Sequence, residues 1–512
     1  MGIKTPRGKR KKESEQDQKI PVKVREVHFE QETEPVNSKG RNTELSIVTY
    51  VFVFLFLLMI GYLVYLNVWK ADSLNSNAYN TKQDANEDKY IRGSIYSSDG
   101  QTLAYTSVAD DGTETRIYPY GNVFAHVIGY SSNGKSGLES TSNSDLMTSH
   151  TSVLTQLREE SEDEKQLADS VYTTLNVTLQ QTAYSALGSY NGAVIALEPS
   201  TGKILAMVSK PDFDPNQIDE IWESVVNDSS SSVLLNRATQ GLYPPGSTFK
   251  ILTTLAYMRE NPSTYSDFTF TCEGTFEESG ASIHCYNSKV HGTVDLKTAF
   301  AKSCNTTFAS IGLSLGNSSL ADVCEEFLFN TSLPTTLQHS TSQFTLSESA
   351  SYGEIMQTAI GQGETLVTPL HMALITATVA NDGVMMQPYL VDYIEANDGT
   401  LVSETKSSRY KRLMTEEEAS VLQEYMEETV ISGTATSLGW YDFTVAGKTG
   451  SAEYGSDSNG GTHSWFVGYS YDDGGEADLV VVVIAEDGGA GSDTAVPIAS
   501  QVFQAYYNYV AE

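Results

Sequence analysis

The longest apolar run in the chain lies near its N-terminus. From Ser46 to Trp69 no residue is charged, and Glu44 and Lys70 bracket the run. About 20 apolar residues in a helix are enough to cross the hydrocarbon core of a bilayer. The run is longer than the apolar part of a signal peptide, and it ends without the small residues of a cleavage site. It therefore predicts one transmembrane helix at 46–69.

A second pattern consists of short runs rich in apolar and β-branched residues, which predict strands. The runs lie at 192–199, 202–209, 443–447, 464–469 and 479–485. The first two flank a turn and predict a hairpin. The chain then closes with an amphipathic helix that has Ile498, Val502, Ala505 and Tyr509 on one face. This order predicts an α+β domain, with one antiparallel sheet of about five strands flanked by helices and a long, mainly helical insertion.

The segments before this domain are more polar. Residues 70–90 predict a solvated linker, 92–106 and 116–130 contain short β-like pieces, and 159–165 is an exposed acidic stretch. The character of the sequence changes at Val171. The predicted parts are a cytoplasmic tail at 1–45, the transmembrane helix at 46–69, an extended, mainly β, non-catalytic domain at 70–170 and the α+β domain at 171–512.

The charge is distributed unevenly on the two sides of the apolar run. The whole chain has 32 Lys and Arg against 65 Asp and Glu, a formal charge of −33. Residues 1–45 hold 11 basic and 8 acidic side chains, or +3, which leaves −36 for the remainder. The basic cluster at 7–12 predicts a cytoplasmic N-terminus and an extracellular body. An acidic body also excludes nucleic acid as the main partner, because phosphate binding needs a basic face.

Cysteine and histidine spacing gives no familiar metal motif. The four cysteines form no CxxC pair, no two histidines stand four residues apart, and no phosphate loop or dinucleotide fingerprint is present. We therefore expect no metal and no cofactor. Cys272 and Cys285 are 13 residues apart around a predicted hairpin, which leaves a disulfide open. Cys304 is expected to pack as a small apolar residue, and His284 and His291 to be structural.

Ser247 is the best candidate for a nucleophile. Five serines have a lysine three residues later: Ser132, Ser200, Ser247, Ser403 and Ser408. Only Ser247 follows a Pro-Pro-Gly turn and precedes an apolar helical run, 251–258. At a helix N-terminus, Lys250 shares a face with Ser247, and a buried, neutral amine can take the serine proton. On this motif alone, an N-cap serine beside a surface lysine is an equally good interpretation.

Two further clusters favour the catalytic interpretation. Ser303-Cys304-Asn305 (the SxN motif) follows a predicted helix at 294–302 and supplies a hydroxyl and an amide. Lys448-Thr449-Gly450 (the KTG motif) ends a predicted strand and is followed by Ser451. A lysine on a strand beside a bare glycine allows an extended peptide to approach while the cation meets its carboxylate. A similar triplet at 135–137 follows no strand.

In this order the three motifs resemble those of penicillin-binding proteins and serine β-lactamases. The segments YPPGSTFK, HGTVDLKTAFAKSCNTTFA, AIGQGETLVTPLHMA, VAGKTGSAE and HSWFVGY resemble the transpeptidase domain of a class B penicillin-binding protein. Upstream, RGSIYSSDGQTLA, HVIGY and GLES resemble the N-terminal pedestal domain of that class. The resemblance covers most of residues 90–510 and is to the short, monofunctional Gram-positive type.

The resemblance implies a peptidoglycan D,D-transpeptidase that cross-links stem peptides ending in D-Ala-D-Ala through a serine acyl-enzyme and is inhibited covalently by β-lactams. It implies that Ser247 is the nucleophile, Lys250 the base and Ser303 a proton relay, and that Asn305 holds the substrate amide. Lys448 and Thr449, beside Gly450, would bind the terminal carboxylate. The backbone N–H groups of Ser247 and Ser451 would form the oxyanion hole. A membrane glycosyltransferase of the wall-synthesis complex is the expected partner.

Four other functions share parts of this pattern. A β-lactamase has the same motifs but is usually smaller and secreted. A β-lactam sensor would have several spans and often a zinc protease. A bifunctional class A protein needs a glycosyltransferase domain, for which 70–170 is too short. A wall-synthesis scaffold with a dead site would not need the intact motifs. These arguments favour the transpeptidase.

Overall fold

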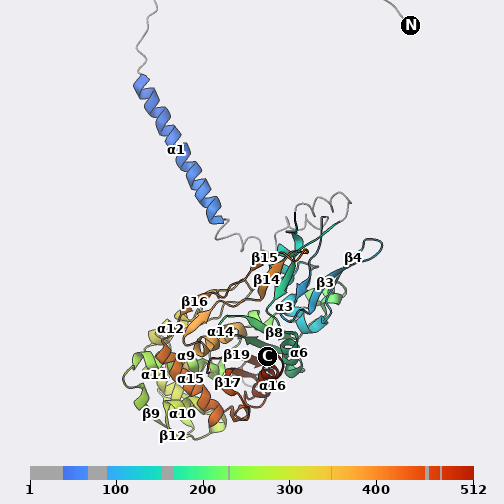
Figure 1. The fold of residues 1–512 in the computed structure, drawn as a ribbon. Coiled ribbons are helices and arrows are strands. Elements are labelled where there is room, and N and C mark those ends of the chain that lie inside the picture. The colour runs from blue at the N-terminus through green and yellow to red at the C-terminus, as the bar shows by residue number, and fades with distance from the viewer. Residues whose placement is uncertain are drawn as a thin grey trace, which may run out of the picture. The chain divides into compact units, whose positions relative to one another are not determined.

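The computed structural model describes residues 38–66, 89–152, 165–228, 231–347, 349–455, 460–472 and 475–511 (Figure 1). Contacts divide the chain into two units, Met1–Lys70 and Ala71–Glu512. The predicted tail up to residue 37, with its basic cluster, lies outside the described residues, as do most of the linker at 70–90 and of the acidic stretch at 159–165. The division into four parts stays a prediction.

Helix α1, Ser38–Tyr65, contains the predicted membrane span. Its segment Leu45–Tyr65 is 21 residues long, and none of it is buried inside the protein. A helix that satisfies its own backbone hydrogen bonds and is apolar on every side is suited to a lipid surrounding. α1 is thus a single-pass membrane anchor. It begins before the predicted residue 46, and residues 67–69 of the predicted span lie outside the described part.

The expected five-stranded antiparallel sheet is present, in the order β17-β18-β19-β7-β8. Its strands are β7 Gly192–Leu197, β8 Ile204–Lys210, β17 Thr444–Tyr454, β18 Gly461–Tyr471 and β19 Leu479–Ala485. All four neighbouring pairs are antiparallel. The two halves of the sheet, far apart in the sequence, meet where β7 pairs with β19. β17 is an edge strand.

Helices cover both faces of this sheet, which explains why its strands are apolar without a break. Along β19, Val480, Val482 and Ile484 enter one core, while Val481 and Val483 enter the other. Helices α6 (Val177–Leu187) and α16 (Ala495–Tyr509) pack on the second face. Because side chains alternate along a strand, each strand contributes to both cores.

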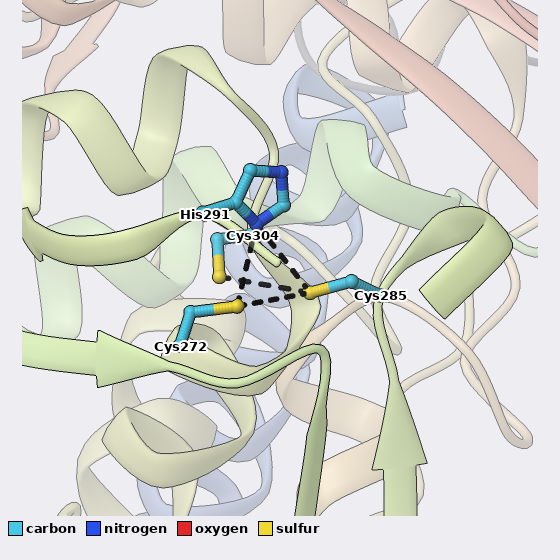
Figure 2. Close-up of side chains that lie close together, drawn as sticks. All are labelled: Cys272, Cys285, His291 and Cys304. Atoms are coloured by element: carbon cyan, nitrogen blue, oxygen red, sulfur yellow. Dashed lines mark hydrogen bonds between the residues drawn. The ribbon is translucent and has the colours of Figure 1, made fainter. Parts of the chain in front are cut away.

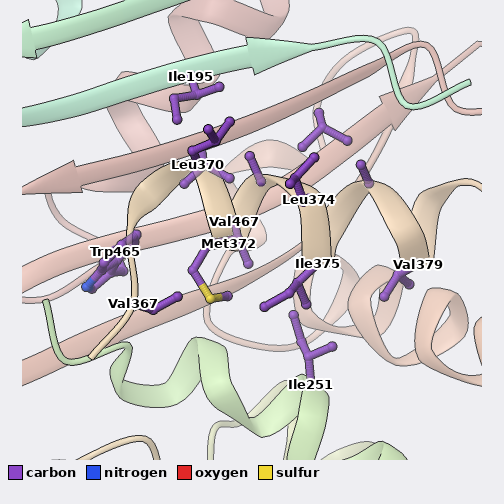
Figure 3. Close-up of a cluster of buried hydrophobic side chains, with 14 of the residues drawn as sticks. Ile195, Ile251, Val367, Leu370, Met372, Leu374, Ile375, Val379, Trp465 and Val467 are labelled. Carbon is purple, nitrogen blue, oxygen red and sulfur yellow. The ribbon is translucent and has the colours of Figure 1, made fainter. Parts of the chain in front are cut away.

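Helix α14, Pro369–Ala380, is the centre of the larger core, and every one of its residues is buried. Figure 3 shows it between the sheet, represented by Ile195 and Val467, and the helix that carries Ile251. A helix that is apolar all round is buried on every side. α14 therefore fixes the distance between the sheet and helix α9, which leads away from the candidate nucleophile.

The insertion between β8 and β17 contains most of the helices, as expected. Its helices of six or more residues are α7 Ile218–Asn227, α9 Lys250–Glu260, α10 Leu296–Ala301, α11 Asn305–Ser314, α12 Asn317–Glu326, α13 Tyr352–Ala359, α14 and α15 Glu416–Ile431. A short helix, α8, spans Arg237–Gln240. Three small two-stranded sheets pair β9 Thr269–Cys272 with β12 Gly292–Asp295, β10 Thr275–Glu278 with β11 Ala281–His284, and β13 Val384–Met386 with β16 Arg409–Arg412.

A second large sheet has six strands in the order β15-β14-β6-β2-β3-β4. Its strands are β2 Ile95–Tyr96, β3 Thr102–Val108, β4 Glu114–Ile117, β6 Ser170–Thr173, β14 Val391–Glu395 and β15 Leu401–Glu404. A hairpin from beyond residue 390 completes this sheet, which no sequence pattern indicated. Three stacked tyrosines lie across β2, β6 and β14, where the hairpin joins the sheet. The ring centroids are 4.8 Å apart for Tyr96–Tyr172 and 4.4 Å apart for Tyr172–Tyr393. A separate pair joins β1 Tyr90–Ile91 to β5 Gln166–Leu167.

The N-terminal region also buries a charge. Glu139 lies on α4, Gly137–Thr141, and its side chain is fully buried. It is bound by Arg92 at 2.6 Å and by Arg116 at 2.7 Å. Burial raises the pKa of Glu139, but the two guanidinium groups outweigh burial and keep the pKa below its usual value.

Three local expectations are wrong. Residues 121–128, expected as β-like, form the helical turns η3 Gly121–Phe124 and α3 Ala125–Ile128. Val294, expected in a helix, lies in strand β12, because α10 begins only after Asp295, which caps it by accepting a hydrogen bond from the Thr298 N–H. On α16, Tyr509 is 71% exposed, since it lies in the last turn beyond the sheet.

Candidate active site

The turn that carries Ser247 is locked from both sides. It is a 3₁₀ turn, Gly246–Phe249, that runs directly into α9 at Lys250. Ser247 is partly exposed, while both of its chain neighbours are buried. From β18, the fully buried Trp465 donates its indole N–H to the Pro244 carbonyl at 3.1 Å. The predicted entry turn therefore presents one hydroxyl from an otherwise buried segment.

Gly361 allows a second segment to approach this turn. Its carbonyl accepts a hydrogen bond from the Gly246 N–H at 2.8 Å. A Cβ atom on Gly361 would lie 2.0 Å from the Gly246 carbonyl oxygen, and its φ of +79° also favours glycine. Next to it, the side-chain amide of Gln362 pairs with the backbone of Glu453 on β17, at 3.0 and 3.1 Å. The loop after α13 thereby connects the serine turn to the sheet.

Lys250 brings the SxxK and SxN motifs together. Its Nζ atom is fully buried and lies 3.1 Å from Ser247 Oγ and 3.2 Å from Ser303 Oγ. It donates to the Ser303 carbonyl at 3.0 Å and to Asn305 Oδ1 at 2.8 Å. These two oxygens only accept, so they take two amine hydrogens. A neutral amine then has its lone pair available for the serine proton.

The SxN motif lies between α10 and α11 in a strained turn. Ser303 has φ +55°, which is uncommon for a residue other than glycine. Asn305 is the first residue of α11, and its Nδ2 donates to the His284 carbonyl at 3.0 Å. The small sheets before α10 therefore hold the amide whose oxygen binds Lys250.

The KTG motif lies on the edge strand β17. Lys448 is fully buried, donates to the Thr449 carbonyl at 3.0 Å and stands 5.6 Å from the centre of the Phe300 ring. The Thr449 hydroxyl bonds that of Thr434, which follows α15. A Cβ on Gly450 would meet side-chain carbons of Thr248 and Trp465 at 3.0 Å, so glycine allows the serine turn to pack closely against β17.

Burial shifts both lysines toward the neutral form. It lowers the pKa of Lys250 to about 8, against smaller raising effects of negative charge on Cys304 and Cys285. It also lowers the pKa of Lys448 well below its ordinary value, and the nearby Lys250 charge adds to that effect. Two amines close together in a dry site cannot both carry a proton cheaply. The arrangement suits a lysine that exchanges protons with a serine.

The structure thus brings Ser247, Lys250, Ser303 and Asn305 into direct contact, and it packs the KTG strand against the serine turn. Ser451 follows on β17, and its hydroxyl accepts a hydrogen bond from the Gly491 N–H at 3.2 Å. The other four SxxK serines are not among the polar groups that contact Lys250. Ser408, for example, is exposed before β16.

Sequence reasoning missed the residues that support the site. Gln362 and Trp465 lie in segments that carry the family resemblance, but their contacts with β17 and the serine turn were not expected, and Thr434 lies outside those segments. The Tyr243 hydroxyl and the Arg237 guanidinium both donate to Glu486, each at 2.7 Å, which anchors the chain just before the Pro-Pro-Gly turn. These contacts leave no local sequence signal, because each depends on pairing across the fold.

Four potential metal ligands also lie together, next to the SxN motif: Cys272, Cys285, His291 and Cys304. Figure 2 shows their side chains turned toward one another. All four cysteines of the chain are free, and the sulfur atoms of Cys272 and Cys285 are 3.7 Å apart. The disulfide that the sequence left open is therefore not formed. Cys304 is buried as expected, but among other thiols.

Comparisons with known families agree on both halves of the chain. The penicillin-binding protein transpeptidase domain family matches residues 192–504, and the penicillin-binding protein A dimerisation domain family matches residues 92–171. Peptidoglycan D,D-transpeptidase PbpA of Mycolicibacterium smegmatis is 33% identical over 472 residues, which cover 88% of this chain and 94% of that protein.

Solved structures give the same result. The imipenem acyl-enzyme complex of penicillin-binding protein A from M. tuberculosis has a TM-score of 0.75 and 32% identity, covering 82% of this chain and 99% of that one. The D,D-transpeptidase domain of a peptidoglycan glycosyltransferase from Eggerthella lenta has a TM-score of 0.72 and 32% identity, with coverage of 81% and 98%.

Proposed function

The chain belongs to the penicillin-binding protein transpeptidase family and is a peptidoglycan D,D-transpeptidase, and from that premise we propose that Ser247 is the residue that becomes acylated. The observation that carries this assignment is the contact of the buried Lys250 amine with Ser247, Ser303 and Asn305 at 2.8–3.2 Å. A nucleophile, a base and groups that orient the base form the basic unit of serine acyl transfer.

In the first half-reaction, neutral Lys250 takes the proton of Ser247 as Oγ attacks the penultimate D-Ala carbonyl. The backbone N–H groups of Ser247 and Ser451 donate to the developing oxyanion. Ser303 Oγ, 3.2 Å from Lys250, passes the proton to the departing D-Ala amine. The peptide C–N bond breaks and an ester to Ser247 forms, so atoms and charge balance without a cofactor.

In the second half-reaction, the amine of an acceptor stem peptide attacks the ester. Lys250 takes a proton from that amine and returns one to Ser247 Oγ, which regenerates the free enzyme with a new peptide bond. Proton transfer by a positioned group contributes about 10²–10⁴-fold to such steps. The same general base thus serves both halves of a ping-pong cycle.

The KTG strand would bind the donor substrate. An extended donor peptide would lie along the edge strand β17, with its terminal carboxylate between the Lys448 ammonium and the Thr449 hydroxyl. Asn305 would bind a backbone amide of the donor through its side chain. A bound carboxylate raises the pKa of Lys448 again, because an opposite charge favours the protonated amine. Lys448 would therefore take up its proton together with the substrate.

β-Lactams would acylate the same serine, since their strained amide presents a carbonyl and a carboxylate at the positions of the donor peptide. The test is intact-protein mass spectrometry of the full chain in detergent after exposure to benzylpenicillin. We expect one stable adduct per chain, lost in Ser247→Ala and located on Ser247 by peptide mapping. Ser408→Ala is the matched control, because Ser408 also precedes a lysine by three residues but is exposed far along the chain.

The possible outcomes of this experiment distinguish a transpeptidase from a β-lactamase and from an inactive scaffold. A stable adduct on Ser247 supports the transpeptidase. Rapid turnover of the drug without an adduct indicates a β-lactamase, and no reaction in a folded protein indicates a scaffold with a dead site. An adduct that persists in Ser247→Ala refutes the assignment of the nucleophile.

The membrane arrangement completes the proposal. The basic cluster at 7–12 supports a cytoplasmic N-terminus, with the catalytic unit on the outer side of the membrane where peptidoglycan lies. A membrane glycosyltransferase that polymerises the glycan strands would supply uncross-linked substrate and is the expected partner. Protease added to intact cells should digest the chain beyond residue 70 and leave the tail at 1–45; protection of the catalytic unit would reverse the orientation.

A further inference from the structure

We propose that Cys272, Cys285, His291 and Cys304 bind one Zn²⁺ ion, and that this ion holds the SxN motif in place. The site lies outside the residues that carry out acyl transfer, although Cys304 is the central residue of the SxN motif. It departs from the expectation of no metal drawn from sequence spacing.

The distances between the donor atoms agree with tetrahedral zinc. Zn–S and Zn–N bonds of about 2.3 and 2.0 Å place two sulfurs about 3.8 Å apart and a sulfur about 3.5 Å from a nitrogen. Here Cys285 Sγ is 3.7 Å from both Cys272 Sγ and Cys304 Sγ. His291 Nδ1 is 3.4 Å from Cys272 Sγ and 3.7 Å from Cys285 Sγ. All four donor atoms lie within 4.8 Å of one another.

The chemistry of the donors selects the metal. Three sulfurs and one imidazole form a set that structural zinc sites use, and they exclude calcium and magnesium, which prefer oxygen. The three cysteines are almost completely buried and His291 is partly exposed, so the site is closed on the protein side. Four protein ligands leave no open position for water, which indicates a structural rather than a catalytic ion.

The surroundings of Cys304 favour a thiolate. The Thr307 hydroxyl donates to Cys304 Sγ at 3.1 Å, and Thr306 Oγ1 lies 3.3 Å from the same sulfur. Cys304 also immediately precedes α11 and therefore faces the positive end of that helix. Hydrogen bonds of this kind orient metal ligands and are part of a built site. Each cysteine that is still a thiol releases its proton to solvent as its Zn–S bond forms.

The four ligands come from four separate segments of the insertion. Cys272 ends β9, Cys285 follows β11, His291 precedes β12, and Cys304 lies between α10 and α11. β9–β12 and β10–β11 are only two-stranded sheets, which are marginally stable by themselves. One ion would join both sheets to the SxN turn.

The ion would also act on the catalytic site through its neighbours. Cys304 is flanked by Ser303, whose positive φ needs support, and by Asn305, whose Nδ2 bonds His284 next to Cys285. Fixing Cys285 and Cys304 to one ion therefore fixes both ends of that hydrogen bond. Cys304 and Cys285 are positioning residues in this scheme, since they reach the substrate only through Ser303 and Asn305. This part rests on the proposed function.

The first test is metal content. The full chain is purified in detergent without a histidine tag, and zinc is measured by plasma mass spectrometry. We expect about one Zn²⁺ per chain, and less than about one tenth in Cys272→Ser and in His291→Ala. Cys324→Ser is the matched control, because Cys324 is equally buried but lies on α12 outside the cluster. It should retain the zinc.

Cobalt substitution identifies the ligands without relying on activity. Replacing Zn²⁺ by Co²⁺ should give thiolate-to-cobalt charge-transfer absorption and the visible bands of a tetrahedral site. Both should be lost in Cys272→Ser. A chain that binds neither metal after reconstitution, or that contains a Cys272–Cys285 disulfide when isolated from cells, overturns the proposal.

A second test separates positioning from general stability. Removing zinc with a chelator should lower the rate of acylation by fluorescent penicillin at least about tenfold, since small misplacements of catalytic groups are costly. Adding Zn²⁺ back should restore the rate. Cys272→Asp, which keeps a zinc ligand of similar size, should retain metal and most of the rate. Normal acylation of the metal-free chain refutes the positioning role, while the metal content is judged independently of whether Ser247 reacts.

Discussion

Lys250 meets two demands that oppose each other in water. A base has to be neutral, whereas an ordinary lysine is protonated near pH 7. Its burial lowers the pKa to about 8, while Ser303 and Asn305 supply acceptors for its hydrogens. The side chain is therefore neutral often enough to react, and its hydrogen bonds keep it in place.

We predict a pH dependence of acylation from this pKa. With a pKa near 8, about one tenth of Lys250 is neutral at pH 7 and about nine tenths at pH 9. The second-order rate of acylation by benzylpenicillin should therefore rise about ninefold between these values and then level off. Stopped-flow measurement with a fluorescent penicillin checks this. A rate that falls over this range would mean that Lys250 acts as a cation instead.

Gly361 gives a second prediction at this scale, with a control nearby. Gly361→Ala places a methyl group 2.0 Å from the Gly246 carbonyl, so the loop or the serine turn has to move. We expect about 2–4 kcal/mol lower stability and at least tenfold slower acylation. Gly363→Ala has the same φ of +79° but no atom within 3.8 Å, and should cost about 1 kcal/mol with little effect on rate. Equal effects of the two variants in thermal unfolding and acylation would contradict the steric argument.

Individual residues also show which contacts the sequence could predict and which it could not. The i, i+3 spacing predicted the meeting of Ser247 and Lys250, because a helix fixes it. Contact of Lys250 with Asn305 needs α11 to pack on α9, which no local pattern gives. The thiol cluster was missed for the same reason, since Cys272 and His291 are brought together only when β9 pairs with β12. The Gly450 role was expected from the substrate, but the absence of a Cβ also allows close packing against Thr248.

At the scale of elements, α4 presents Glu139 to two arginines in the N-terminal region. Removing the carboxylate from such a buried group of charges leaves the Arg92 and Arg116 guanidinium groups without their anionic partner, which costs about 3–5 kcal/mol. We predict that Glu139→Gln loses about this much stability in urea unfolding. Glu114→Gln, which removes a partly exposed pair with Lys165, should lose about 1 kcal/mol or less. A loss for Glu139→Gln no larger than this control would show that the pair contributes little.

The same carboxyl predicts a pH effect on stability. Its pKa in the folded protein lies below the ordinary value, so the unfolded chain binds the proton more readily. The stabilisation from Glu139 is therefore complete above the ordinary carboxyl pKa and is lost as the pH falls through the lower, folded value. The melting temperature of the wild type should fall as the pH is lowered through this acidic window, and that of Glu139→Gln should fall less. Parallel curves for both proteins would exclude Glu139 as the cause.

Elements differed in how well their patterns predicted them. The five main strands and α1 were predicted because runs of apolar residues are long and local. The prediction of β structure at residues 121–128 was wrong because an apolar stretch that short fits a helical turn as well as a strand. The hairpin β14–β15 could not be assigned to the N-terminal sheet, since its residues carry no sign of which edge they join.

For the whole molecule, the two large sheets are not separate along the chain. β6 lies between β2 and β14, so the N-terminal sheet depends on residues 391–395. We predict that a fragment of residues 165–512, which lacks β2 to β4, exposes one edge of β6 and part of the tyrosine stack. It should melt at least about 5 °C below the fragment 89–512 and aggregate more readily, as scattering and calorimetry would show. Equal melting and solubility of the two fragments would show independent folding.

Strand order also sets the timing of folding during synthesis. The ribosome synthesises β7 and β8 early, but β19, which pairs with β7, ends only at Ala485. Until then β7 has an open strand edge in the nascent chain, which is a target for wrong pairing with other chains. Residues up to 485 must therefore be synthesised before β19 can join β7 to β18 and complete the catalytic sheet. Chaperones that shield the edge of β7 during that interval would prevent such wrong pairing.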